Sequence, residues 1–193
     1  MNDTAKSIYQ LKFKLMGLKP PVWRRVLVPG DISLSNLHYT IQFVMGWQDS
    51  HLHIFHVGKE HFGAKSQDLD KVQDERKVIL QDIAPEAGAG FIYEYDMGDS
   101  WTHQIRVEKV TPATAEFQGI ECLAGERACP PEDCGGVWGY EDMLAAIRDQ
   151  KHEQHDEMVE WLGEDFDPEA FDLVKTNKAF ARKKAPGKNN GRI

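Results

Sequence analysis

The sequence has no apolar run near the roughly 18 residues that span a membrane, and its first ten residues, MNDTAKSIYQ, lack a signal peptide's apolar core. Cysteine is scarce, with three residues in a chain of 193. This small, odd number argues against a disulfide-stapled secreted domain and is typical of a reducing compartment. The sequence therefore predicts a cytoplasmic protein with no membrane partner.

Positive charge is in short supply outside the C-terminus. Residues 1–180 carry 18 Lys and Arg against 31 Asp and Glu, a net of −13, whereas residues 181–193 hold five basic residues and no acidic one. Because nucleic-acid backbones are held by clustered cations, this balance argues against direct binding to DNA or RNA. The tail has no aromatic residue and is rich in Gly, Asn, Lys and Pro. We expect it to be a disordered basic segment.

Common catalytic motifs are also missing. There is no Gly-x-Ser-x-Gly elbow and no phosphate loop, and Gly88 and Gly90 lack the third glycine of a dinucleotide fingerprint. His152 and His155 are three residues apart, whereas a zinc-protease helix needs four, so we interpret them as the start of an exposed helix. No reaction can be named from a motif.

Apolar periodicity predicts the fold. Alternation predicts strands at residues 8–15, 22–28, 51–57, 91–95 and 101–107. Ser33 and Gly46 are typical caps for a helix over residues 34–45. More helices are expected at 140–148 and 153–162, and a last one that begins with Asp167 as its cap and Pro168 in its first turn.

The order of elements is ββαβ…ββ followed by helices, which is typical of an α+β fold. We expect a mixed sheet packed on one main helix, with a helical C-terminal third. Residues 1–180 form a single domain in this interpretation, with a sheet-rich part at 1–118 and a Cys/Pro/Gly loop plus helices at 119–180. Residues 58–90 are charged and show no clear pattern, so their structure is left open.

Two groups of residues could carry chemistry. Cys122, Cys129 and Cys134 lie in the loop at 119–139; with a nearby His or Asp they could hold zinc, or they could be plain thiols, because their spacings lack the tight zinc knuckle. No other cofactor is indicated.

The second group centres on the turn after residue 95. Gly98 is expected to supply the turn's positive φ, and Asp96 and Asp99 commonly bond their own backbone at such turns. Trp101 and His103 share the core-facing side of the next strand, so the imidazole needs partners and the turn carboxylates are the acids closest in sequence. We predict that these side chains line or underpin one concave polar site with three neighbours: Trp47, His51 and His53.

Several motifs in order resemble one known family. They are Trp23-Arg24-Arg25-Val26, Met45-Gly46-Trp47, His51-Leu52-His53, Tyr93 to His103, and Ala128-Cys129-Pro130-Pro131-Glu132-Asp133-Cys134-Gly135-Gly136. Together they resemble the plasmid pRiA4b ORF-3-like family over residues 6 to 180. The resemblance implies an α+β fold of bacterial origin and assigns no activity, substrate or cofactor.

Three functions remain open. The leading hypothesis is a non-enzymatic binding or interaction domain with a polar His/Asp/Trp site and an unknown ligand. The alternatives are a metal-dependent hydrolase that uses Asp96, Asp99 and His103, and a mobile-element protein that acts on DNA through a partner. Metal analysis separates the first two, and salt-dependent binding to random duplex DNA would indicate the third. The sequence identifies no partner and no oligomeric state.

Overall fold

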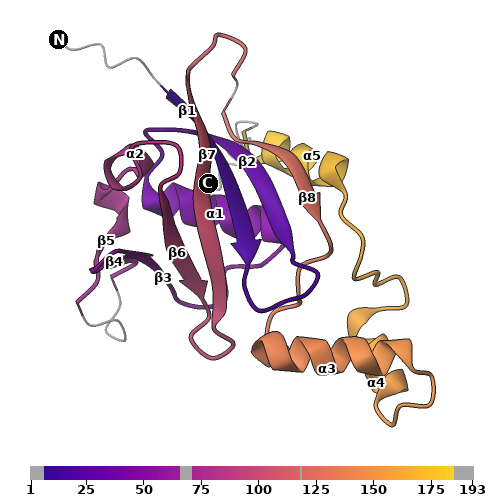
Figure 1. The fold of residues 1–193 in the computed structure, drawn as a ribbon. Coiled ribbons are helices and arrows are strands. Elements are labelled where there is room, and N and C mark those ends of the chain that lie inside the picture. The colour runs from indigo at the N-terminus through magenta and orange to yellow at the C-terminus, as the bar shows by residue number, and fades with distance from the viewer. Residues whose placement is uncertain (1–6, 66–70, 118, 185–193) are drawn as a thin grey trace, which may run out of the picture.

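The computed structural model describes residues 7–65, 71–117 and 119–184, and its centre is a mixed sheet. Eight strands follow one another across this sheet in the order β5-β4-β3-β6-β7-β1-β2-β8 (Figure 1). Their bounds are β1 Ser7–Leu15, β2 Trp23–Pro29, β3 His53–Val57, β4 Glu60–Gly63, β5 Gln73–Asp74, β6 Gly90–Tyr95, β7 Trp101–Pro112 and β8 Glu121–Glu126. Neighbouring strands are antiparallel except β4 and β5, which are parallel.

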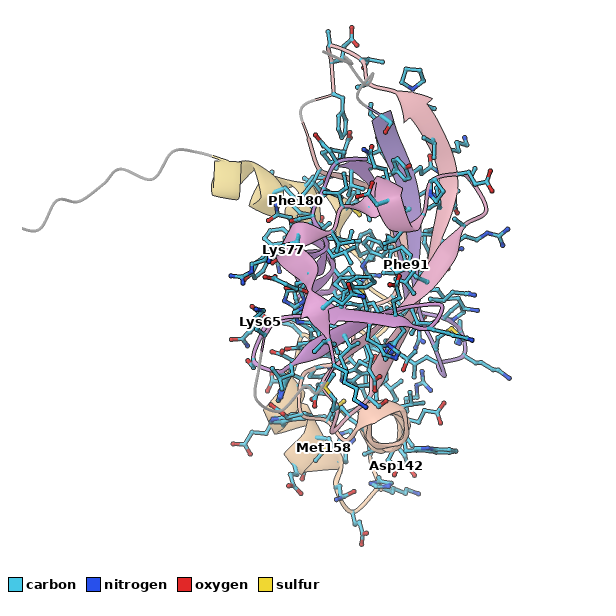
Figure 2. The ribbon with its side chains drawn as sticks, turned by 90° about the vertical axis from the view of Figure 1, so that its left-hand side faces the viewer. Lys65, Lys77, Phe91, Asp142, Met158 and Phe180 are labelled. Carbon is cyan, nitrogen blue, oxygen red and sulfur yellow. The ribbon has the colours of Figure 1, made fainter. Side chains whose placement is uncertain are left out.

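Five α-helices accompany the sheet within these described ranges. They are α1 Leu34–Met45, α2 Leu80–Ile83, α3 Gly136–Arg148, α4 His155–Leu162 and α5 Leu173–Lys184. Figure 1 shows α1 behind the central strands and α5 next to β8. Figure 2 shows α3 and α4, marked by Asp142 and Met158, at the lower end of the molecule. No helix in the described ranges has the length and hydropathy to cross a membrane.

Helix α1 begins and ends where its sequence predicts. The Ser33 side chain accepts a hydrogen bond from the Asn36 amide, and Gly46 takes the left-handed conformation at the C-terminus with φ 90°. Such caps satisfy backbone groups that the helix itself leaves unpaired. Leu37, Ile41 and Val44 are buried, so the predicted apolar stripe of the helix is confirmed.

The core lies between α1 and one face of the sheet. Alternate residues of β1 and β7 point inward, and the predicted members of this layer are all buried: Tyr9, Leu11, Phe13, Ile105 and Val107. The intervening side chains, such as Gln104 and Arg106, face solvent. One-sided burial of an antiparallel strand pair explains the clean alternation in the sequence.

The expectations for the C-terminal third need correction. The loop predicted at residues 119–139 contains strand β8, which pairs with β2 at the sheet edge, with Trp23 opposite Glu126. Its sequence, ECLAGE, lacks the β-branched and aromatic residues that favour strands, so pairing with β2 rather than propensity defines it. The unassigned stretch at 58–90 supplies β4, β5, a 3₁₀ turn at Glu75–Lys77 and α2.

The last helix also begins later than predicted. Asp167 accepts a hydrogen bond from the Glu169 amide in a separate turn, and Asp172 instead caps the helix by accepting from the Lys175 amide. Helix α5 then runs to Lys184, so residues 181–184 of the predicted disordered tail are helical. The remainder of that tail, residues 185–193, lies outside the described residues.

Two buried arginines attach the C-terminal segment to the sheet. The Arg24 guanidinium on β2 donates to the carbonyl oxygens of Val44, Glu126 and Arg127. Arg127 in turn donates to the Pro20 carbonyl and to both carboxylate oxygens of Glu169. These bonds anchor the start of the loop that follows β8, and the candidate site uses this loop.

Candidate functional site

The structure divides the residues predicted for one polar site between the core and the surface. Trp101, His103 and His53 are buried. His51 is part-exposed, and Asp99 lies in the exposed turn between β6 and β7. Trp47 connects the two layers, because its ring lies 4.9 Å from that of Tyr95 and 5.3 Å from that of His103.

His103 is sealed inside the protein with no exposed surface. Its Nδ1 lies 3.2 Å from the Trp101 carbonyl oxygen, and its Nε2 has no hydrogen-bond partner among the described residues. The expected bond to a turn carboxylate is therefore not formed. Burial lowers the pKa of His103 to about 4, so the ring is neutral at pH 7. His103 belongs to the scaffold beneath the site.

The turn between β6 and β7 is built around the Asp96 side chain. Asp96 Oδ1 accepts hydrogen bonds from the amides of Gly98, at 2.9 Å, and Asp99, at 3.4 Å. This confirms that a turn carboxylate bonds its own backbone. The positive φ expected at Gly98 occurs instead at Asp96, φ 58°, and Ser100, φ 53°. Asp tolerates the left-handed region because its short side chain hydrogen-bonds locally.

At the surface, His51 faces two carboxylates from different segments. Its Nε2 lies 3.6 Å from Asp96 Oδ2 and 3.1 Å from Asp133 Oδ1. We call these three residues the His51 cluster. One ligand atom from each lies within 4.8 Å of the other two, yet His51 Nε2 makes no hydrogen bond of good geometry. An imidazole and two carboxylates so close together can hold a cation.

Tyr95 positions two of the surrounding segments. Its hydroxyl accepts hydrogen bonds from the amides of Ser50, at 2.9 Å, and His51, at 3.3 Å. It donates to Glu132, the neighbour of Asp133. Burial and this bond to Glu132 raise the pKa of the Tyr95 phenol, which therefore stays a donor. One buried hydroxyl thus fixes both the His51 backbone and the loop opposite.

The turn and the loop are also joined directly. Asp99 Oδ2 accepts a hydrogen bond from the Gly135 amide at 3.2 Å. Gly136 has φ 68°, and a Cβ there would lie 2.5 Å from the Asp99 carbonyl oxygen, so the close approach requires glycine. Trp47 Nε1 completes the attachment by donating to the Pro130 carbonyl at 2.9 Å.

A recess of about 560 Å³ opens beside the cluster. The residues that form its polar and aromatic lining are Trp47, Gln48, Ser50, Glu132, Asp133, Trp161 and Phe166. Its charged lining residues, Glu132 and Asp133, are both acidic. The sequence argument did not select Asp133 as a site residue, although the family resemblance includes it, because nothing in the local pattern shows that this loop folds against the turn.

His53 belongs to a different, buried group. Its Nε2 lies 2.6 Å from Glu75 Oε2, and its ring stacks on His38 with centroids 3.5 Å apart and an angle of 6°. His38 contacts the Tyr93 hydroxyl through Nδ1 and Asp49 through Nε2, each at 2.8 Å. We call His38, Asp49, His53, Glu75 and Tyr93 the His38 network.

The His38 network is poorly shaped for a metal ion, although His38, Asp49 and His53 offer ligand atoms within 4.8 Å of one another. Imidazole lone pairs lie in the ring plane, and two nearly parallel planes stacked 3.5 Å apart cannot both contain one ion. Burial lowers the pKa of His38 to about 4, which keeps that ring neutral at pH 7. This group is a hydrogen-bonded part of the scaffold, buried except at Asp49.

The three cysteines do not meet at one point. Cys122 is buried in β8, whereas Cys129 and Cys134 lie in the loop that follows. Within the described residues, the groups with three ligand atoms close enough for a metal ion consist of histidines and aspartates. Burial raises the pKa of Cys134 to about 12, and it raises that of Cys129 as well. The described residues therefore offer no three-ligand group that includes a cysteine, which does not favour the zinc site considered from the sequence.

Known proteins share this fold and much of the sequence. "Uncharacterized protein y4hQ" from Sinorhizobium fredii is 41% identical over 176 residues, 90% of each chain. The crystal structure of the protein of unknown function MM3350 from Methanosarcina mazei Go1 superimposes with a TM-score of 0.82 at 40% identity, over 89% of this chain and 98% of that chain. Residues 7–175 match the family model described as plasmid pRiA4b ORF-3-like protein, and the chain therefore belongs to this family.

Proposed function

We propose that this protein is a non-enzymatic binding domain and that the recess beside the His51 cluster holds a small, positively charged ligand. The observation that carries this proposal is the lining of the recess. Both charged side chains there are acidic, and the half-exposed ring of Trp161 stands beside them. Aromatic walls with a few fixed polar groups are typical of small-molecule sites, and aromatic faces attract cations.

The positions of the predicted catalytic residues support a binding function rather than hydrolysis. A hydrolase that used Asp96, Asp99 and His103 would need all three at one solvent-accessible point, but His103 has no exposed surface. Asp99 uses one carboxylate oxygen to hold the Gly135 amide. The acidic lining also disfavours direct contact with a phosphate backbone, so a mobile-element protein of this kind would need a partner to act on DNA.

Isothermal titration calorimetry with spermidine and choline tests the proposal, with ATP as the anionic probe. We expect one or both cations to bind and ATP not to bind. Trp161→Ala should weaken cation binding at least tenfold through the lost aromatic face, and Glu132→Gln should weaken it through the lost charge. Trp138→Ala is the matched control, because Trp138 is 80% exposed and is not among the recess residues.

Two outcomes would overturn the proposal. One is the absence of binding by either cation at millimolar concentration, or binding that Trp161→Ala leaves unchanged. The other is turnover of nitrophenyl ester or phosphodiester substrates that Asp96→Asn abolishes, which would establish an enzyme. Salt-dependent binding to random duplex DNA that Asp133→Asn strengthens would favour the DNA-acting alternative.

A further inference from the structure

We propose that the His51 cluster is a binding site for a divalent transition-metal ion, with Zn²⁺ as the reference ion. The ligands are His51 Nε2, Asp96 Oδ2 and Asp133 Oδ1. The site goes beyond the recess ligand proposed above, since only Asp133 belongs to both.

The first argument is the spacing of the ligand atoms. Bonds of about 2.0–2.1 Å in a tetrahedral zinc site place neighbouring ligand atoms about 3.3 Å apart. His51 Nε2 lies 3.1 Å from Asp133 Oδ1 and 3.6 Å from Asp96 Oδ2, on either side of that value. One ligand atom from each residue lies within 4.8 Å of the other two, so the spacing suits a single ion.

Hydrogen bonds to other residues fix the segments that carry the three ligands. Asp96 Oδ1 is occupied by the turn amides, which fixes the carboxylate and leaves Oδ2 to face His51. The His51 amide donates to the Tyr95 hydroxyl. The Gly135 amide, two residues after Asp133, donates to the Asp99 carboxylate. Metal sites depend on such supporting bonds to orient their ligands.

The burial of His51 Nε2 without a hydrogen bond also favours a bound ion. His51 Nε2 is covered from solvent, yet it has no hydrogen bond of good geometry, although two carboxylates lie at ion-pair distance. An ion among the three atoms would satisfy all of them at once.

The ligand set selects the class of ion. One imidazole nitrogen with two carboxylates suits Zn²⁺, Mn²⁺ or Fe²⁺ better than Ca²⁺ or Mg²⁺, which prefer oxygen-only shells. The Asp133 side chain is 71% exposed, whereas that of Asp96 is 10% exposed. The outward side of the site is therefore open, and an ion with three protein ligands keeps a position for water or another small ligand.

Calorimetric titration of chelator-treated protein with ZnCl₂ at pH 7 tests the site. We expect one strong site per chain in the wild type, at least a hundredfold weakening in His51→Ala, and at least tenfold weakening in Asp133→Asn. MgCl₂ should bind at least a hundredfold more weakly than ZnCl₂. Circular dichroism melting curves confirm that each variant is folded, and Mn²⁺ electron paramagnetic resonance gives an independent measure of occupancy.

The matched control is His61→Ala. His61 and His56 form an exposed pair, with their Nδ1 atoms 3.0 Å apart, which could bind zinc adventitiously. This variant should keep the strong site. Zinc binding that His61→Ala abolishes, or that His51→Ala and Asp133→Asn leave unchanged, would overturn the inference, as would the absence of binding below 100 µM.

The experiments can overturn either proposal without the other. Glu132→Gln should weaken spermidine binding and leave zinc affinity within about threefold, because Glu132 is not a ligand. His51→Ala should do the reverse. Spermidine binding in the recess without a zinc site would overturn the metal inference alone, and a zinc site without any organic cation would overturn the proposed function alone.

Discussion

The His38 network and the His51 cluster use the same chemistry in opposite settings. Each combines imidazole with carboxylates. The histidines, Glu75 and Tyr93 of the first are buried, with only Asp49 exposed, whereas the second is made by residues in loops and a turn. In the His38 network, the side chains contact one another through close hydrogen bonds and a ring stack. At the surface, the ligand atoms converge without bonding one another. The comparison shows that burial and partners, rather than residue type, separate a scaffold from a candidate site.

The largest expected effect is loss of stability when the buried network is broken. Glu75→Ala leaves the His53 imidazole without its partner at 2.6 Å, inside a region where both residues are at most 5% exposed. We expect a loss of about 3–5 kcal/mol in the free energy of unfolding, measured in urea. Asp133→Ala at the surface should change it by less than about 0.5 kcal/mol. Equal losses in the two variants would contradict the contrast.

Acid should destabilise the folded protein because His103 is buried as a neutral imidazole. The pKa of His103 is about 4 in the folded protein, against about 6.5 when exposed, so the unfolded state binds more protons between these values. Stability is then lost as the pH falls from about 6.5 to about 4, by about 3 kcal/mol from this residue.

The variant His103→Leu should remove this residue's share of the pH dependence, whereas His38, whose pKa is also about 4, should keep its own. The stability of His103→Leu at pH 7.5 should stay within about 1.5 kcal/mol of the wild type, because only the Nδ1 contact with the Trp101 carbonyl oxygen is lost. At pH 4.5 His103→Leu should be the more stable protein. Urea unfolding across this pH range measures both. Thr40→Ala, a non-titrating change elsewhere in the core, should keep the wild-type slope.

The close approach of the loop to the turn predicts a smaller effect. Gly136→Ala meets two obstacles, a φ of 68° and a Cβ 2.5 Å from the Asp99 carbonyl oxygen. Gly163 has φ 87° but open space around its Cβ, so Gly163→Ala isolates the backbone contribution. We expect losses of about 2–3 kcal/mol and about 1 kcal/mol, respectively, in urea unfolding. Similar losses would mean that the loop can move away from the turn.

The smallest effect should come from Asp99. Asp99→Ala removes the acceptor for the Gly135 amide at an exposed position, so we expect a loss of about 0.5–1 kcal/mol in the free energy of unfolding. Asp99→Asn keeps an oxygen acceptor and should stay within about 0.5 kcal/mol of the wild type. A larger loss in Asp99→Asn would indicate that the negative charge itself holds the loop.

Local patterns predicted the elements that a single sequence period controls. The half-buried strands, the cap at Ser33 and the αL residue at Gly46 follow from alternation and capping, and the structure confirms them. Strand β8 could not be predicted this way, because pairing with β2 defines it and its own residues do not favour a strand. Asp172 replaced Asp167 as the cap of α5, since two Asp residues five positions apart offer equal local signals.

The candidate site was predicted in part. The turn at Asp96 and the inward direction of His103 follow from strand alternation. Which histidine would meet the carboxylate depended on long-range folding: His51 reaches Asp96 because β3 pairs with β6, with His53 opposite Tyr95. Asp133 joins them only because the loop after β8 is clamped to the turn at Gly135.

The junction between α5 and β8 has a consequence for association between molecules. Strand β8 lies at the edge of the sheet, where unpaired backbone groups could recruit a strand from another chain. The Asn177 side chain on α5 fills this place, because its amide accepts from the Cys122 N–H at 2.9 Å and donates to the Cys122 carbonyl at 2.8 Å. A single carboxamide thus pairs both backbone groups of Cys122 as a neighbouring strand would, and leaves them unavailable to a strand from another chain.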